Sequence, residues 1–280
     1  MARGAREVFT ANGVVTITTD FGMRDGYVGA VKGVMLSIEP TLRLVDVAHD
    51  LPAQDVRHAA VVLRAACPRF PRGTVHLAVI DPGVGSEREA IVASAAGHAF
   101  IGPDNGLFAL ALGELGGAVV ARRIERAGRL GEVLPERPSA TFHGRDVFAP
   151  VAAAIASGRV SLDEVGRELA RVHPLALPRP ERSPDDVRGE VTHFDRFGNA
   201  VTNVRADDLP APCDALAAEL ADGRRVRVVA TYAAARPGEL VAVVGSEGLL
   251  ELATRDGSAR EAAPLALGAR VRFARAAAGS

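Results

Sequence analysis

The sequence predicts an α/β fold in which an N-terminal, mostly parallel α/β sandwich domain precedes a smaller C-terminal all-β, barrel-like domain. Three observations lead to this prediction. Strand-like and helix-like runs alternate over residues 1–172, as in parallel sheets covered by helices. A proline-rich stretch at 173–186 has the composition of an extended linker. Strand-sized runs dominate residues 187–280, which favours a small barrel or sandwich.

Short apolar runs in the N-terminal part predict strands. They lie at residues 14–19, 42–47, 75–80, 91–95 and 99–101. Apolar residues with helical spacing predict helices at 27–38, 55–66, 105–112 and 147–157. Parallel sheets bind ligands beyond the carboxyl ends of their strands, and three predicted strands carry aspartates there: Asp20, Asp46 and Asp81.

The C-terminal part contains strand-sized runs separated by turn residues. They lie at 187–194, 200–204, 224–230, 240–244, 249–253 and 270–274. Helical spacing is expected only near 215–220.

Composition excludes several classes of function. With 33 basic and 34 acidic residues, the chain lacks the bulk positive charge that holds nucleic acid or an anionic membrane. Cys67 and Cys213 share no metal-ligand spacing and are expected to be reduced thiols of a cytoplasmic protein. No signal peptide or membrane helix is expected. The histidines lack ligand spacing, so no metal site is expected either.

The segment TTDFGMRDGY places two carboxylates around a turn. Asp20 follows a strand directly, and a carboxylate with both oxygens free can grip vicinal hydroxyls such as those of a ribose. Asp25 opens the next helix. Alternatively, both residues can serve as caps of the turn and the helix, a role that suits Asp25 better than Asp20.

The segment DPGVGSER is a glycine-rich turn after a buried strand. It lacks the ending of a phosphate-binding loop. Asp81 and Arg88 can pair across the turn, and taken alone this pair is a structural salt bridge. The segment TFHGRD leaves His143 in a loop before a helix for which Asp146 is the expected N-cap. A single histidine of this kind is more often structural than catalytic.

Two polar turns interrupt strands of the C-terminal part. In FDRFGN, Phe194 and Phe197 can anchor the turn in the core or offer a stacking surface for a flat base, whose edge Asn199 would read. The turn GSEG contains Ser246 and alone would be a hairpin loop.

Together, these segments resemble the S-adenosylmethionine hydroxide adenosyltransferases, which share a family with adenosyl fluorinases and chlorinases. The resemblance covers most of the chain through TTDFGMRDGYVGAVKGV, VHLAVIDPGVGSER, PDNGL, TFHGRDVFAPVAA, FDRFGNAVTN and VGSEGLLELA, in that order. Six ordered motifs are far more specific than any one of them.

The resemblance implies hydrolysis of S-adenosyl-L-methionine (SAM) to adenosine and methionine, without a cofactor, in a homotrimer whose sites lie between subunits. It implies that Asp81, Arg88 and His143 form the catalytic triad. The implied substrate contacts are Asp20 to the ribose, Asp25 and Asp195 to the amino-acid part, Phe197 and Asn199 to adenine, and Ser246 to the methionine end.

One position departs from the pattern, because Glu247 stands where the halogenases carry an arginine. Two other functions remain to be distinguished: a halide-dependent adenosyltransferase, and a module that binds SAM or adenosine without catalysis. A halide site must be dry and free of competing polar groups, so His143 beside Arg88 disfavours the first.

Overall fold

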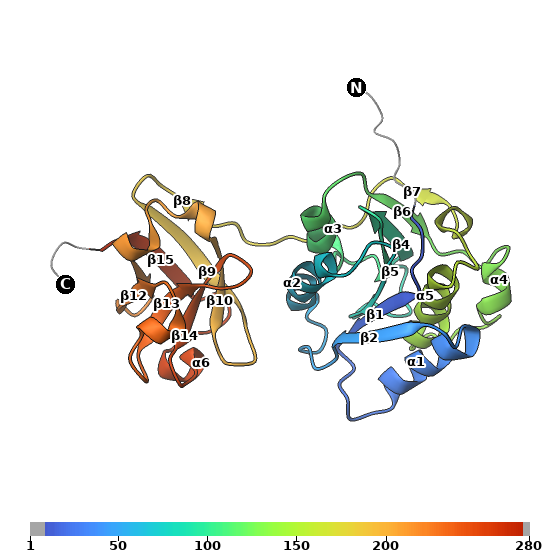
Figure 1. Cartoon of the computed structure of the whole chain (residues 1–280), viewed down its shortest axis with the longest axis horizontal. Helices are drawn as coiled ribbons and strands as arrows, with labels where there is room; N and C mark the ends of the chain where they lie inside the picture. The colour runs from blue at the N-terminus through green and yellow to red at the C-terminus, as the bar shows by residue number, and fades with distance from the viewer. Residues whose placement is uncertain (1–8, 277–280) are drawn as a thin grey trace, which may run out of the picture. The chain divides into compact units, whose positions relative to one another are not determined.

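The computed structural model describes residues 9–276. The chain divides into two compact units, Met1–Ala176 and Leu177–Ser280, which are both visible in Figure 1. Among the described residues, no helix is long and apolar enough to cross a membrane.

The first unit contains a seven-stranded sheet in the order β2-β1-β3-β5-β4-β6-β7. Its strands are β1 (Val14–Thr19), β2 (Arg43–Ala48), β3 (Val75–Val79), β4 (Ala90–Ala95), β5 (His98–Pro103), β6 (Val120–Arg123) and β7 (Glu168–Leu169). Strands β2, β1, β3 and β5 pair in parallel, and β4, β6 and β7 extend the sheet through antiparallel pairs. All five predicted strands are present, whereas β6 and β7 were not predicted.

Helices cover both faces of this sheet (Figure 1). They are α1 (Tyr27–Ile38), α2 (Val56–Ala66), α3 (Ala109–Leu115), α4 (Leu130–Val133) and α5 (Ala149–Ala156). Strand side chains alternate between the faces. Leu77 of β3 packs in the core that includes residues of α1 and α5. Its neighbour Ala78 packs in the core that includes residues of α2 and α3. The alternation gives the predicted three-layer sandwich.

The second unit is a barrel. Its strands are β8 (Glu181–Arg182), β9 (Asp186–Phe194), β10 (Ala200–Arg205), β11 (Leu216–Leu220), β12 (Arg225–Val229), β13 (Leu240–Val244), β14 (Leu249–Thr254) and β15 (Arg270–Arg275). Seven of them follow one another in the order β10-β14-β13-β12-β11-β15-β9, and pairing of β9 with β10 closes the ring. Helix α6 (Ala259–Ala262) precedes β15, and β8 pairs with β9 outside the ring. The predicted fold class is confirmed.

Three local predictions were wrong. Residues 216–220 are not helical, because Leu216, Ala218 and Leu220 are buried in alternation and form β11, and a short 3-10 turn at Cys213–Ala215 precedes it. The helix predicted at 105–112 is shifted, since α3 begins only at Ala109. Asp146 is not an N-cap, because it lies within a π-helical turn at Gly144–Phe148 that precedes α5.

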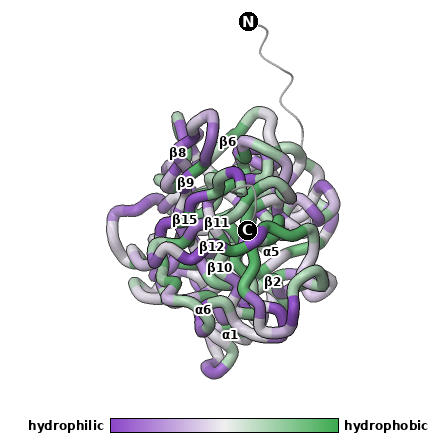
Figure 2. The backbone as a smooth tube through the Cα atoms, turned by 90° about the vertical axis from the view of Figure 1, so that its left-hand side faces the viewer, coloured by the Kyte–Doolittle hydropathy of each residue, from purple (hydrophilic) through white to green (hydrophobic). Residues whose placement is uncertain are grey.

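Hydropathy along the backbone follows this architecture. Figure 2 shows the apolar run of α5 as hydrophobic and β8 as hydrophilic. Helix α5 is buried on all sides, from Ala149 to Ala156. It is therefore a central element of the first unit, and the π-helical turn attached to it has a firm support.

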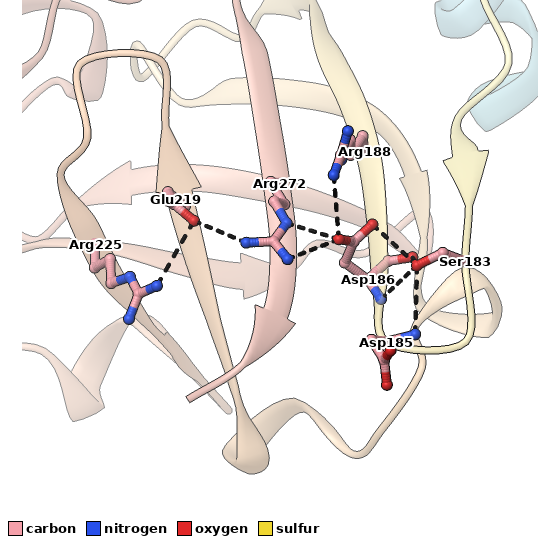
Figure 3. A network of polar contacts seen from close by, with 7 residues as sticks. All are labelled: Ser183, Asp185, Asp186, Arg188, Glu219, Arg225 and Arg272. Carbon is pink, nitrogen blue, oxygen red and sulfur yellow. Dashed lines mark hydrogen bonds and ion pairs between the residues drawn. The ribbon is translucent and has the colours of Figure 1, made fainter. Parts of the chain in front are cut away.

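A network of charged side chains crosses the outer face of the barrel (Figure 3). Arg272 of β15 donates from Nε to Asp186 Oδ2 of β9 (2.8 Å) and from Nη1 to Glu219 Oε2 of β11 (3.1 Å). Its neighbours Val271 and Phe273 are buried in the barrel core. The alternation places Arg272 outside, where it connects three adjacent strands.

Candidate functional site

Three polar side chains meet beyond the carboxyl end of β3. Arg88 donates from Nε to Asp81 Oδ1 (2.9 Å) and from Nη2 to Asp81 Oδ2. The same Nη2 lies 2.7 Å from Nδ1 of His143. Only 11% of the Arg88 side chain and 5% of the Asp81 side chain are exposed. The structure thus brings together the three residues of the predicted catalytic triad.

Close packing of two loops brings His143 to Arg88. Gly85 has φ +78°, and a Cβ on it would lie 2.6 Å from the carbonyl oxygen of Ala140. Only glycine permits this approach of the 81–88 loop to the loop that carries His143. The buried Phe148 lies beneath both loops. Its ring centroid is 5.3 Å from Cζ of Arg88 and 6.5 Å from the ring centroid of His143.

The hydrogen bond to Arg88 defines the protonation of His143. A guanidinium only donates, so Nδ1 of His143 must accept and Nε2 carries the proton of the neutral ring. Burial and the charge of Arg88 lower the pKa of His143 below its ordinary value, against the opposing influence of Asp81 and Asp146. At neutral pH His143 is therefore an uncharged group that offers an N–H from Nε2.

Asp20 lies at the same edge of the sheet. Strands β1 and β3 are parallel, with Thr19 opposite Val79, so the residues that follow them emerge side by side. The Oδ2 atom of Asp20 accepts from the backbone N–H of Gln54 (2.7 Å). A Cβ on Gly144 would lie 3.2 Å from Cζ of Phe21, so the loop that follows β1 packs against the one that carries His143.

Asp25 is exposed just before α1. Nearby, the rings of Phe21, Tyr27 and Phe142 form an edge-to-face cluster with centroids 5.4–6.1 Å apart. These three rings join the segment that carries Asp20 and Asp25 to the segment that carries His143. Sequence reasoning did not identify this cluster.

In the barrel, the predicted residues of the FDRFGN turn form a tight loop. Asp195 Oδ1 accepts from the backbone N–H groups of Phe197 (2.9 Å) and Asn199 (2.8 Å), and Oδ2 accepts from Asn199 Nδ2 (2.8 Å). Asp195 therefore organises the loop. Phe197 is 76% exposed, so it does not anchor the turn, whereas Phe194 packs against the barrel core.

Ser246 lies apart from this loop, exposed in the turn between β13 and β14. The register of β10 with β14 pairs Ala200 with Leu252 and Arg205 with Leu249. The two strands are antiparallel, with Asn199 just before β10 and Ser246 shortly before β14. The two residues therefore lie at opposite ends of this strand pair. Ser246 is not in the hydrogen-bonded Asp195 loop.

Glu251 lies between these two turns, and sequence reasoning missed it. Its carboxylate occupies the space that a Cβ on Gly245 would fill, and Oε2 accepts from the hydroxyl of Tyr232 (2.9 Å). Burial raises the pKa of Glu251, opposed by the Tyr232 hydrogen bond and reinforced by the charge of Asp195. Burial, Glu251 and Asp195 together raise the pKa of Tyr232 to about 12. The only sequence signal was an acid within an apolar strand.

Two family models match most of the chain. Residues 15–166 match the SAM hydroxide adenosyltransferase N-terminal domain, and residues 189–272 match the SAM hydroxide adenosyltransferase C-terminal domain.

Individual proteins and structures agree with this match. The chain is 43% identical over 277 residues to the (R)-S-adenosyl-L-methionine hydrolase of Thermus thermophilus, which covers 92% of this chain and 98% of that protein. A protein of the same name from Salinispora tropica is 40% identical over 263 residues, with coverage of 92% and 96%. A fluorinase from an Actinoplanes species is 30% identical over 289 residues, with coverage of 91% and 93%.

A crystal structure of an uncharacterized conserved protein from Thermotoga maritima superimposes with a TM-score of 0.85 at 34% identity, covering 93% of this chain and 100% of that one. The matches extend over both units, including the segments that carry the candidate site residues. The chain belongs to the SAM hydroxide adenosyltransferase family.

Proposed function

We propose that this protein hydrolyses SAM to adenosine and L-methionine by in-line attack of water at C5′. The observation that carries the proposal is the buried contact among Asp81, Arg88 and His143. This cluster presents donors and one carboxylate at the edge of the sheet where ligands bind, close to the Asp20 loop.

The leaving group of this reaction needs no assistance from the protein. The C5′–S bond of a sulfonium breaks to give a neutral thioether, so methionine departs without protonation. A C5′–O bond forms with water, and one proton is released. The reaction as proposed requires no cofactor, because neither the leaving group nor the electrophile needs further activation.

The difficult step is to hold a weak nucleophile in line and to remove its proton. In the proposal, Arg88 and Nε2–H of neutral His143 orient the water, and the carboxylate of Asp81 accepts the proton that the water loses. Orientation removes much of the entropic cost of the attack, and a positioned base contributes typically ~10²–10⁴-fold.

The remaining residues hold the substrate. Asp20 binds the ribose hydroxyls through Oδ1, because Oδ2 already accepts from Gln54. Phe197 stacks on adenine, and Asn199 offers its Oδ1 to the base edge while Nδ2 donates to Asp195. Asp25, Asp195 and Ser246 contact the methionine part.

We further propose a cytoplasmic homotrimer in which each site combines the first unit of one subunit with the barrel of its neighbour. Cys67 and Cys213 are free thiols, as a reducing compartment favours. The candidate residues fall into two groups, one in each unit.

The decisive experiment is incubation of the purified protein with SAM, with and without excess chloride, followed by separation of the products. Hydrolysis yields adenosine, methionine and one proton per turnover, which a pH indicator in weak buffer detects. Chloride displacement yields 5′-chloro-5′-deoxyadenosine and releases no proton. Unchanged SAM would leave only a binding function. In water enriched in oxygen-18, the label should enter the adenosine 5′-hydroxyl, and its absence would exclude direct attack.

A further inference from the structure

A chain of polar contacts runs through the first unit beside Asp20, and the proposed reaction does not use it. The Oγ1 atom of Thr19 lies 2.8 Å from Nδ1 of His49. On the other side of the ring, Nε2 of His49 lies 3.0 Å from Asp46 Oδ1, off the ideal hydrogen-bond direction. Nζ of Lys32 donates to Asp46 Oδ2 (2.6 Å).

The Asp46 carboxylate orients these polar contacts. Asp46 is an ionised acceptor: partial burial opposes its ionisation, but contacts with His49 and Lys32 prevail and lower its pKa. In the tautomer whose Nε2–H faces the carboxylate, Nδ1 of His49 accepts from the Thr19 hydroxyl. The Thr19 oxygen in turn accepts from the backbone N–H of Phe21 (3.3 Å).

The backbone is irregular where these polar contacts form. Strand β1 pairs with β2 in parallel until Ile17 faces Asp46, and then the register skips one residue so that Thr18 faces Ala48. Such irregularities redirect side chains and are frequent beside active sites. The His49 side chain is only 4% exposed, and Thr19 is fully buried.

Backbone groups of residues 46–54 also contact the turn that contains Asp20. The carbonyl oxygen of His49 accepts from the N–H of Gly22 (2.8 Å), and Gln54 donates its N–H to Asp20. Gln54 has φ +65°, a conformation that costs free energy for a residue other than glycine. Contacts from residues 46–54 therefore hold Asp20 and both sides of the turn that contains it.

We propose that His49 is a positioning residue for ribose recognition: with Asp46 and Thr19 it fixes the turn that aims Asp20 at the sugar hydroxyls. The inference rests on the proposed role of Asp20 in the proposed hydrolysis. It assigns to His49 an effect on the reading of the sugar, beyond a contribution to stability.

The test compares two substrates, SAM and its 2′-deoxy counterpart, through kcat/KM. The wild-type protein defines the discrimination between them, and Asp20→Ala should abolish it. Thr19→Val keeps the volume but removes the hydroxyl, and it should lower discrimination about tenfold, mainly through KM for SAM, as expected for the loss of one positioning hydrogen bond. Thr19→Ser restores the hydroxyl and should restore discrimination.

Three further variants complete the design. His49→Gln should act in the same direction as Thr19→Val, and the half-exposed Asp46→Asn provides the same measurement if His49→Gln does not fold. His98→Gln is the matched control, because His98 is also buried but lies at the start of β5, the opposite end of the parallel strands. It should leave discrimination unchanged even if it lowers stability.

The outcomes separate this inference from the proposed function. If Thr19→Val or His49→Gln slows both substrates equally, or neither, His49 has no role in reading the sugar and the inference is wrong. If Asp20→Ala discriminates as the wild type does, the role given to Asp20 is wrong. A wild-type protein that leaves SAM intact overturns the proposed function itself.

Discussion

At the scale of single residues, the proposed chemistry depends on which atoms of Asp81, Arg88 and His143 remain available to a water molecule. Arg88 uses Nε and Nη2 on Asp81 and shares Nη2 with His143. The lone pair of His143 Nδ1 is therefore engaged, and its free group is the Nε2–H. A histidine arranged in this way orients a water by donating to it, and the carboxylate of Asp81 is the better acceptor.

The first prediction concerns His143 itself. His143→Ala should lower kcat by about 10²-fold or more with little change in KM, because the ring acts on the water and not on SAM. His143→Gln should retain more activity than His143→Ala, because its amide can donate in place of Nε2–H. Steady-state kinetics of both variants test this. A parallel loss of SAM binding and turnover would show that His143 is a structural residue.

The second prediction concerns pH. Burial and then the charge of Arg88 lower the pKa of His143 from its ordinary value of 6.5. The ring therefore stays neutral at pH 6.5 and somewhat below that pH. We expect kcat/KM to stay level above that pH and to fall in more acidic solution, because a proton on Nδ1 of His143 breaks the contact with Arg88 that positions both groups. Replacing Arg88 with methionine should raise the pKa of His143, which a proton NMR titration of the ring measures without reference to activity. A pKa that stays the same or falls would contradict the assigned contact.

Sequence reasoning found the residues of the triad because each lies in a recognisable polar segment. It could not find the contact of His49 with Thr19, because these residues are 30 positions apart and meet only through a register irregularity. Glu251 was missed for a related reason: its neighbour Gly245 and its partner Tyr232 come from other segments of the barrel.

At the scale of elements, the site depends on how closely two loops can pack. Strand prediction succeeded for β1 and β3 because buried parallel strands are continuous apolar runs ended by polar residues. It failed for β11, whose alternating burial involves small alanines that suit helices equally well. The docking of Gly85 on Ala140 joins residues far apart in sequence and has no local pattern.

The third prediction tests this docking. Gly85→Ala should destabilise the protein by about 1–3 kcal/mol, because a positive φ is unfavourable for alanine and the new Cβ would meet Ala140. It should also lower kcat by moving Arg88 away from His143. Thermal unfolding and kinetics measure the two effects. Gly116→Ala is the control, since Gly116 also has a positive φ (+68°) but has no atom within 4 Å of the added Cβ. Equal effects of the two substitutions on kcat would show that the contact is unimportant.

At the scale of the whole molecule, stability is sensitive to acid through a buried histidine pair. His76 is fully buried, lies 2.8 Å from Thr16 Oγ1 through Nδ1, and lies 3.0 Å from Nδ1 of His98 through Nε2. Burial, and then the proximity of His98, lower the pKa of His76 to about 3. In mildly acidic solution, His76 therefore stays unprotonated in the folded protein and is protonated in the unfolded chain.

The fourth prediction follows from the sign of this difference. Below pH 6.5 the unfolded chain binds a proton at residue 76 and the folded protein does not, so the free energy of unfolding decreases as pH falls toward 3. Its slope from this residue approaches about 1.4 kcal/mol per pH unit. Denaturant titrations at pH 7, 6, 5 and 4 measure it. His76→Gln should reduce the slope, and an unchanged slope would assign the acid sensitivity to other groups.

The fifth prediction concerns the assembly, where the two groups of candidate residues lie in separate units of one chain. If each site combines units from neighbouring subunits of a homotrimer, Asp20→Ala and Asn199→Ala should complement each other when the two inactive proteins are unfolded and refolded together. A site is intact when its first unit comes from the Asn199→Ala chain and its barrel from the Asp20→Ala chain. Random mixing in equal amounts makes this true for about one quarter of the sites in a closed ring. Adenosine formation should therefore return to about a quarter of the wild-type rate, whereas a site contained within one chain would give no recovery at any mixing ratio.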